Sequence, residues 1–141
     1  MTTQPVSMLD AALGLAARGF SVFPIWWKRG ELCACGDAGC KSPCKHPLGA
    51  LVRDGCHDAT REPDTIRRWW SEYPDANIGI ATGAPSGVWV FDVDEGSGGD
   101  VSLASLVEQH GPVPGTLRVR TGRGWHYSFA YQPGMKNSAG A

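Results

Sequence analysis

Hydrophobic and polar positions along the chain follow a helical period in three stretches. Apolar residues recur at helical spacing in 7–18, 62–73 and 101–110, and each stretch predicts an amphipathic helix. Ser7 is the expected N-cap of the first helix, and Gly19 is its expected stop. The two adjacent tryptophans of the second stretch fall on its apolar side, so we expect them in the core.

A second pattern, runs of β-branched and aromatic residues, predicts five strands: 21–26, 77–82, 88–94, 116–121 and 125–131. Glycine-rich turns join the second strand to the third and the fourth to the fifth, so two hairpins are expected. This order of elements predicts an α+β fold with a largely antiparallel or mixed sheet flanked by helices. The 141 residues suffice for one domain, which we assign to 1–141.

The strand at 88–94 ends in two carboxylates, Asp92 and Asp94. Side chains alternate along a strand, so both carboxylates point to one face, about 7 Å apart. Like charges on one rigid face repel unless a cation lies between them, and oxygen ligands suit Mg²⁺ or Mn²⁺. Alternatively, one aspartate merely ends the strand and the other begins the next turn. The motif alone gives these two interpretations equal weight.

Residues 31–47 lack both periods and have few apolar side chains to pack. Four of the five cysteines lie there, in the pattern Cys-x-Cys-x4-Cys-x3-Cys-x-His. An odd number of cysteines crowded into one loop favours metal ligation over disulfides, and zinc takes four such ligands in a tetrahedron. We expect a structural zinc insertion whose ligands are Cys33, Cys35, Cys40 and His46, with Cys44 as the alternative. Cys56 stands apart and is expected to be a small buried residue.

Charge and hydropathy narrow the partners only slightly. The net charge is −1, so charge alone does not demand a nucleic-acid partner. No apolar run is long enough for a membrane span, and we expect no membrane partner. His126 follows the Gly-Arg-Gly turn 122–124, with Arg120 and Arg123 nearby, a combination that suits phosphate oxygens. The alternative for this histidine is an ordinary packed or surface residue.

Eight short motifs run through nearly the whole chain in a fixed order, at 18–24, 45–47, 58–60, 66–70, 76–80, 82–83, 90–94 and 121–126. Together they resemble the bifunctional DNA primase/polymerase domain of the archaeo-eukaryotic primase superfamily. The joint pattern is far more specific than any single motif. Members often carry a similar cysteine-rich insertion, commonly with glycine at the position of Cys44, which makes this cysteine the spare.

The resemblance implies template-directed nucleotidyl transfer. Asp92 and Asp94 would hold the catalytic Mg²⁺ or Mn²⁺ ions, and His126 would contact the triphosphate of an incoming dNTP or NTP. The other nucleotide-binding residues implied by the family lie in one loop and two turns: Lys45, Thr82, Gly83, Gly122, Arg123 and Gly124. Template contacts are expected from four arginines: Arg67, Arg68, Arg118 and Arg120.

The family pattern continues to a third acidic residue, and we expect residues 1–141 to stop before it. The implied partners are a single-stranded DNA template, a primer and a helicase or other replication domain. The implied setting is the cytoplasm of a prokaryotic host, in replication of a phage, plasmid or mobile element. Two other functions stay open: a non-catalytic zinc-containing nucleic-acid-binding module, and a sugar-nucleotide transferase with an Asp-x-Asp motif.

Overall fold

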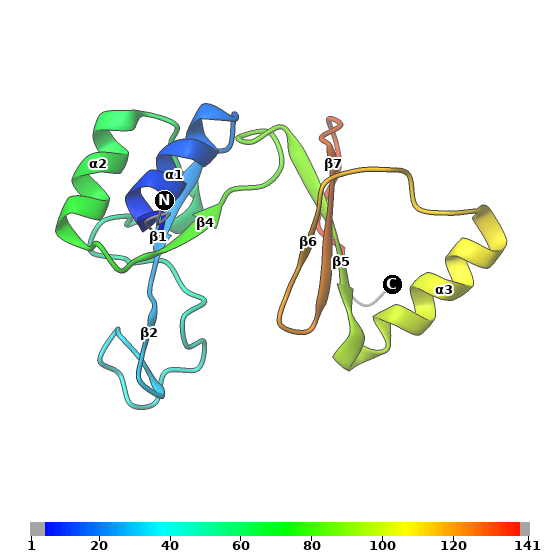
Figure 1. Ribbon diagram of the computed structural model, residues 1–141, viewed down its shortest axis with the longest axis horizontal. Coiled ribbons are helices and arrows are strands. Elements are labelled where there is room, and N and C mark those ends of the chain that lie inside the picture. Colours follow the sequence, from blue (N-terminus) through cyan, green and yellow to red (C-terminus); the bar gives the residue numbers. More distant parts are fainter. Residues whose placement is uncertain (1–4, 139–141) are drawn as a thin grey trace. The chain divides into compact units, whose positions relative to one another are not determined.

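The computed structural model describes residues 5–138, and the chain forms two compact units, Met1–Ala81 and Thr82–Ala141, each described by itself (Figure 1). Helices combine with antiparallel strand pairs, so the expected α+β class is confirmed. In the described part of the chain, the strands form three small sheets and not one. Within 5–138, no helix has the length and apolar character needed to cross a membrane. One catalytic domain spanning 1–141 stays a prediction.

The helices of the first unit begin where the sequence predicts. They are α1 (Met8–Ala17) and α2 (Pro63–Glu72). Ser7 caps α1, because its Oγ accepts a 3.1 Å hydrogen bond from the Asp10 N–H. Gly19 follows the helix at φ +99°, a left-handed conformation that a residue with a side chain adopts only with strain.

The core of the first unit lies between its helices and a two-stranded sheet. Strand β1 (Val22–Ile25) pairs antiparallel with β4 (Asn77–Ile80), and both helices contact this ribbon (Figure 1). The adjacent tryptophans of α2 are buried as expected, and the Trp70 Nε1–H donates to Ala76 O at 2.9 Å. The main core residues are Ala12, Val22, Phe23, Leu48, Val52, Ile66, Trp69, Trp70 and Ala76.

The predicted hairpin between 77–82 and 88–94 is wrong. Strand β4 pairs with β1, and β5 (Val88–Asp94) pairs with a strand near the C-terminus; only an isolated bridge joins Gly83 to Val88. Local glycine content suggested a tight turn, but tertiary fit decides the pairing. Gly79 receives the ring of Phe23, whose Cε1 would lie 2.7 Å from any Cβ at that position.

The second unit is a three-stranded antiparallel sheet in the order β5-β7-β6, with one helix against it (Figure 1). Strands β6 (Arg118–Arg120) and β7 (Gly124–Ala130) form the second predicted hairpin, which is confirmed. The short helix η2 (Glu95–Ser97) leads from β5 into α3 (Gly99–His110). Helix α3 contacts β5 but buries no residue fully, and a cavity of about 360 Å³ lies between it and the aromatic face of the sheet.

Candidate functional site

The cysteine-rich loop is closed at its base by pairing between its two ends. An antiparallel bridge joins Ile25 to Pro47, and the Trp26 N–H donates to His46 O at 3.1 Å. Two short strands not expected from the sequence, β2 (Lys28–Arg29) and β3 (Leu32–Cys33), form a hairpin above this base. The stem therefore holds Cys33 on one side and His46 on the other before any metal is considered.

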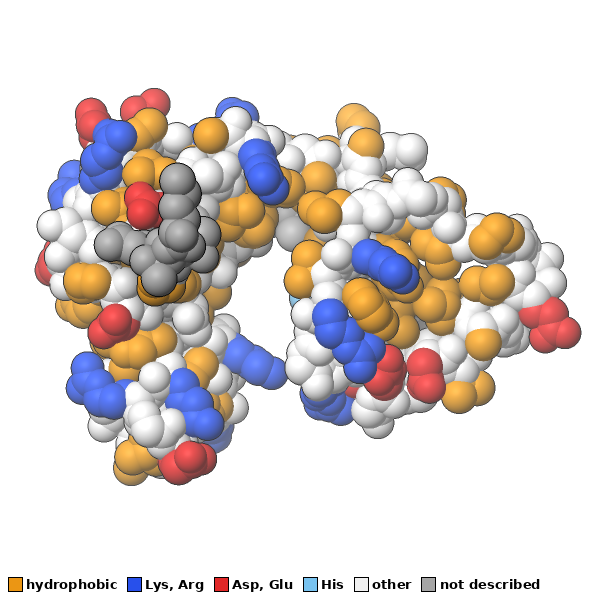
Figure 2. Space-filling model, in the orientation of Figure 1, with side chains coloured by type: hydrophobic (Ala, Val, Ile, Leu, Met, Phe, Trp, Pro, Cys, Tyr) orange, Lys and Arg blue, Asp and Glu red, His pale blue; other side chains and the backbone are white. Residues whose placement is uncertain are grey.

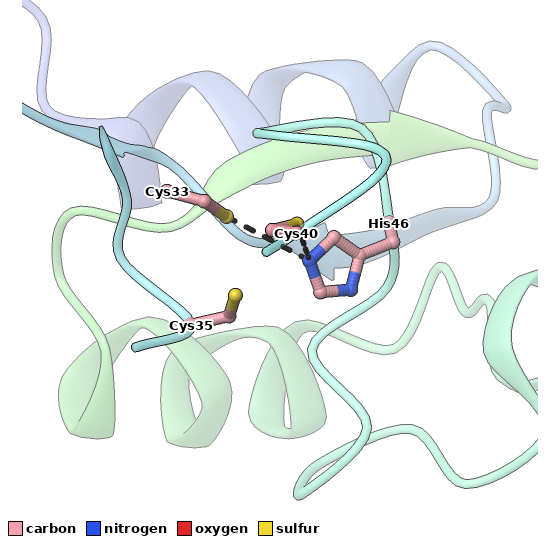
Figure 3. A group of neighbouring side chains, drawn as sticks. All are labelled: Cys33, Cys35, Cys40 and His46. Carbon is pink, nitrogen blue, oxygen red and sulfur yellow. Dashed lines mark hydrogen bonds between the residues drawn. The ribbon is translucent and has the colours of Figure 1, made fainter. Parts of the chain in front are cut away.

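Four side chains of this loop converge on one point: Cys33, Cys35, Cys40 and His46 (Figure 3). Their ligand atoms all lie within 4.8 Å of one another, and His46 Nε2 is 3.7 Å from Cys33 Sγ and 3.5 Å from Cys40 Sγ. Zinc–sulfur and zinc–nitrogen bonds at a tetrahedral angle place two such ligand atoms about 3.6 Å apart. The expected ligand set therefore has the spacing of a group that can hold zinc.

The environment of Cys33 favours the thiolate that a metal requires. Burial raises the pKa of this thiol. Hydrogen bonds from the backbone N–H groups of Cys35 and Cys44 and from the His46 ring together lower the pKa by more than burial raises it. The resulting pKa is about 6, below the ordinary 9.0, so the thiolate predominates at neutral pH. A preformed thiolate lowers the cost of ligand deprotonation on metal binding.

Cys44, the alternative ligand, lies outside the four-residue group. Its backbone contacts the group instead: the Cys44 N–H donates a hydrogen bond to Cys33 Sγ at 3.4 Å. The residue adopts φ +61°, which glycine reaches without strain, and burial together with the nearby Cys33 raises the pKa of its thiol. Cys56 was expected to be buried, and this is wrong: it is exposed in η1 (Gly55–Asp58), a surface turn.

The second candidate site is the face of the β5-β7-β6 sheet that carries Asp92 and Asp94. The strand register places Asp92 directly opposite His126, whose Nε2 is 3.4 Å from Asp92 Oδ1. Asp94 lies opposite Gly124 and beside Arg123, whose Nε is 3.3 Å from Asp94 Oδ1. The sheet thus brings together two carboxylates, an imidazole and a guanidinium that the sequence had predicted to act together.

One carboxylate oxygen of Asp94 accepts no hydrogen bond. Its Oδ1 is buried, and the nearby guanidinium is close enough for ion pairing without the geometry of a hydrogen bond. A buried carboxylate oxygen without a hydrogen bond is costly, and a hard cation would satisfy it. This orphaned oxygen is the observation that fits Asp92 and Asp94 to a divalent metal. Within 5–138, however, the two carboxylates and His126 do not converge as tightly as the zinc-type group does.

This site depends on close contact between the backbone at Gly124 and Gly99 and the backbone at the end of β5. A Cβ on Gly124 would lie 2.8 Å from the Val93 carbonyl carbon and overlap its oxygen, while one on Gly99 would lie 2.8 Å from the Asp94 nitrogen. The Thr121 N–H donates to Gly124 O at 2.8 Å, which closes the β6-β7 turn next to the carboxylates. Glycine at these positions lets β7 and the start of α3 pack directly on the acidic end of β5.

Glu95 is a charged residue of this region that the sequence did not single out. It pairs with Arg120 at 2.8 Å, and its N–H donates to Arg123 O at 2.8 Å, so it connects η2 to the β6-β7 turn.

Arg118 and Arg120 lie on the sheet face opposite Asp92, where both stack over Trp125 at 4.9 and 5.1 Å. This face is not the one that carries Asp92 and Asp94, so template contacts by these two arginines stay a prediction.

The structure does not gather all the expected nucleotide-binding residues at one place. Gly83 adjoins Val88, the first residue of β5, and strand rise puts that end about 20 Å from Asp94. The turn 122–124 lies at the acidic end, so it and the Thr82-Gly83 turn flank opposite ends of β5. Lys45 is exposed in the cysteine-rich loop of the other unit, and its role stays a prediction.

One comparison with known proteins gives a match. The family model "Bifunctional DNA primase/polymerase, N-terminal" (Prim-Pol) matches residues 12–141. That span includes the cysteine-rich loop, both carboxylates and His126. No curated protein and no solved structure matches the chain.

Proposed function

Since the chain belongs to the Prim-Pol family, we propose that it performs template-directed nucleotidyl transfer, with Asp92 and Asp94 at the reacting centre. Membership supports a primase/polymerase-type function with DNA and nucleotides as substrates. The observation that carries the finer proposal is the carboxylate face: Asp92 opposite His126 at 3.4 Å, and Asp94 with an orphaned buried oxygen.

In this proposal Asp92 and Asp94 hold Mg²⁺ or Mn²⁺. Bound divalent ions supply activation of a 3′-hydroxyl and neutralisation of phosphate charge. The chain's own contribution is to fix both carboxylates on one strand, where β7 pairing and the close contact at Gly124 prevent them from moving apart. Asp92 is the more exposed of the two and Asp94 the less exposed, so the pair spans the boundary between solvent and sheet.

His126 and Arg123 are proposed to bind the triphosphate. Each lies within 3.4 Å of one carboxylate, so positive and negative groups alternate across a small area. Nucleotide phosphates would compete for the imidazole and the guanidinium, and an Arg side chain binds phosphate oxygens in a planar, bidentate way.

The Cys33, Cys35, Cys40 and His46 group is proposed to hold structural zinc. Four protein ligands leave no open position for chemistry, which is typical of a structural site. The metal would order a loop that buries little apolar surface of its own. A helicase partner, replication of a mobile element and a cytoplasmic location stay predictions.

The test is incorporation of dNTPs on a primed template with Mg²⁺ or Mn²⁺, in this chain and in any longer natural chain that contains it. Asp92→Asn and Asp94→Asn should each lower incorporation about 100-fold or more, because each removes a charge that holds metal while keeping side-chain size. Asp100→Asn, an exposed carboxylate in the first turn of α3, is the matched control and should retain activity.

Wild-type incorporation by both Asp92→Asn and Asp94→Asn would refute the assignment of these residues. A folded protein that incorporates no dNTP and binds none in a metal-dependent way would favour the non-catalytic binding module instead. Transfer from a sugar nucleotide in preference to a dNTP would favour the glycosyl-transferring alternative.

A further inference from the structure

Three aromatic side chains form a cluster at the base of the cysteine-rich loop: Trp26, Trp27 and Tyr73, called here the aromatic platform. The two indoles stack with ring centroids 5.5 Å apart and planes 27° apart. The Tyr73 ring meets each of them edge-on at 6.3 Å. None of the three is fully buried, although all adjoin the core of the first unit.

The loop that contains the two tryptophans of the aromatic platform is rich in basic side chains. Residues 26–47 carry four basic side chains against the two acidic ones Glu31 and Asp37; the basic ones are Lys28, Arg29, Lys41 and Lys45. All four basic side chains are exposed. Figure 2 shows Lys and Arg side chains gathered over the part of the first unit where Figure 1 places β2. A chain with net charge −1 therefore places four basic side chains in the loop that contains these partly buried indoles.

The Trp27 ring already has a planar cation over it. The Arg29 guanidinium lies over this ring, 5.8 Å from its centroid. A nucleobase is also planar and stacks on the same kind of surface, and the exposed guanidinium would then be released to a phosphate.

We propose that the aromatic platform and its flanking cations bind single-stranded DNA, with a base stacked on Trp27 and phosphates contacted by Lys28 and Arg29. This inference rests on the proposed function, since it names the surface that holds the template strand. Duplex DNA keeps its base faces stacked internally, so stacking on a partly exposed indole favours single strands. The mixture of aromatic and basic side chains favours DNA over an apolar protein partner.

The competing explanation is that Trp27 only anchors the loop to α2. Trp27→Leu separates the two, because leucine keeps apolar bulk for packing but offers no aromatic face. Trp27→Phe restores an aromatic face. Zinc content and thermal unfolding, measured for each variant, report whether the loop remains intact.

The experiment is fluorescence anisotropy with labelled oligo(dT) and with an abasic strand of equal length, at several salt concentrations. The wild type should bind oligo(dT) more tightly than the abasic strand. Trp27→Leu should lose about 5-fold or more on oligo(dT), the lower end of one stacked base, and should change little on the abasic strand. Trp27→Phe should recover most of the loss.

Arg29→Ala should weaken binding to both strands and reduce the salt slope by about 0.7, the value for one phosphate contact on a single strand. Arg53→Ala removes an exposed arginine outside residues 26–47 and is the matched control, with binding unchanged. Wild-type affinity for oligo(dT) in Trp27→Leu, or equal wild-type affinity for the abasic strand, would overturn the proposal.

Failure of this proposal and failure of the proposed function give different results. If Asp92→Asn abolishes incorporation while Trp27→Leu binds oligo(dT) normally, the aromatic platform is refuted and the catalytic assignment stands. If oligo(dT) binding depends on Trp27 but no protein incorporates dNTPs, the platform stands and the catalytic assignment falls.

Discussion

Gly124 provides a direct test of the geometry that holds the carboxylate face together. In Gly124→Ala the new Cβ would overlap the Val93 carbonyl oxygen and lie 2.8 Å from its carbon. Both obstructing atoms belong to the backbone of a paired strand, so no side chain can move aside. Overpacking of this kind costs about 3 kcal/mol, the upper part of its usual range. For a unit of this size, that cost lowers the melting temperature by about 12–24 °C.

Gly122 is a matched control within the same turn. A Cβ there meets nothing within 4 Å, and neither glycine is among those with positive φ, so alanine is free of backbone strain at both positions. Both substitutions stiffen the unfolded chain alike, so that effect cancels between them. Gly122→Ala should therefore change the free energy of unfolding by no more than about 0.5 kcal/mol.

Thermal unfolding followed by circular dichroism gives the size of the effect, and hydrogen exchange of the β5 and β7 amides gives its location. Gly124→Ala should lose exchange protection in β5 and β7 and also lose dNTP incorporation, because β7 carries His126 opposite Asp92. Equal melting temperatures for the Gly122 and Gly124 variants would show that Gly124 and the Val93 carbonyl are not in close contact, so this contact would not hold the carboxylate face together.

Three further predictions concern the first unit. Cys40→Ser should purify without zinc, whereas Cys44→Ser should keep about one zinc per chain, as measured by metal analysis; the reverse result would exchange their roles. Chelation should remove exchange protection from 31–47 and leave α1, α2 and β1 protected; unchanged protection of 31–47 after chelation would argue against the zinc site. Trp70→Phe should lower the free energy of unfolding by about 1–3 kcal/mol, because the buried Ala76 carbonyl loses its donor; an unchanged denaturation midpoint would contradict this.

Much of the fold could be predicted because local signals and tertiary packing agree there. The helix period of 62–73 matches α2, whose buried face carries both tryptophans, and the Ser7 cap matches the start of α1. The pairing of β4 could not be predicted in the same way. It depends on the contact between Gly79 and the Phe23 ring, which joins segments far apart in the sequence and leaves no local pattern.

For the candidate sites too, local features could be predicted from the sequence and contacts between distant segments could not. The i, i+2 spacing of Asp92 and Asp94 and the cysteine spacing are local, and the structure places those residues as expected. Two features escaped sequence reasoning. The Glu95–Arg120 pair requires the β6-β7 register, and the aromatic platform requires a tyrosine that ends α2 to meet indoles that follow β1. For the platform, the adjacent Trp-Trp-Lys-Arg residues were a usable signal.

The two units are stabilised in different ways, and this bears on how the carboxylate face tolerates change. The first unit has a buried core around two tryptophans and a loop suited to zinc. In 82–138, Val93 is the one fully buried hydrophobic side chain, while Val101 and Val119 are more than half exposed. The second unit therefore relies on strand pairing and on half-buried ring pairs such as Trp89 with Phe129, 4.9 Å apart.

Strand pairing also sets the distance from Asp92 to His126, so the proposed chemistry and the stability of the second unit depend on the same interactions. A substitution that weakens the β5-β7 ladder should lower activity before it unfolds the chain, because the first unit keeps its own core. A substitution in the core of the first unit should instead unfold α1 and α2 before it disturbs the β5-β7 ladder. The carboxylate face is thus expected to lose function through loss of register, at temperatures where α1 and α2 are still intact.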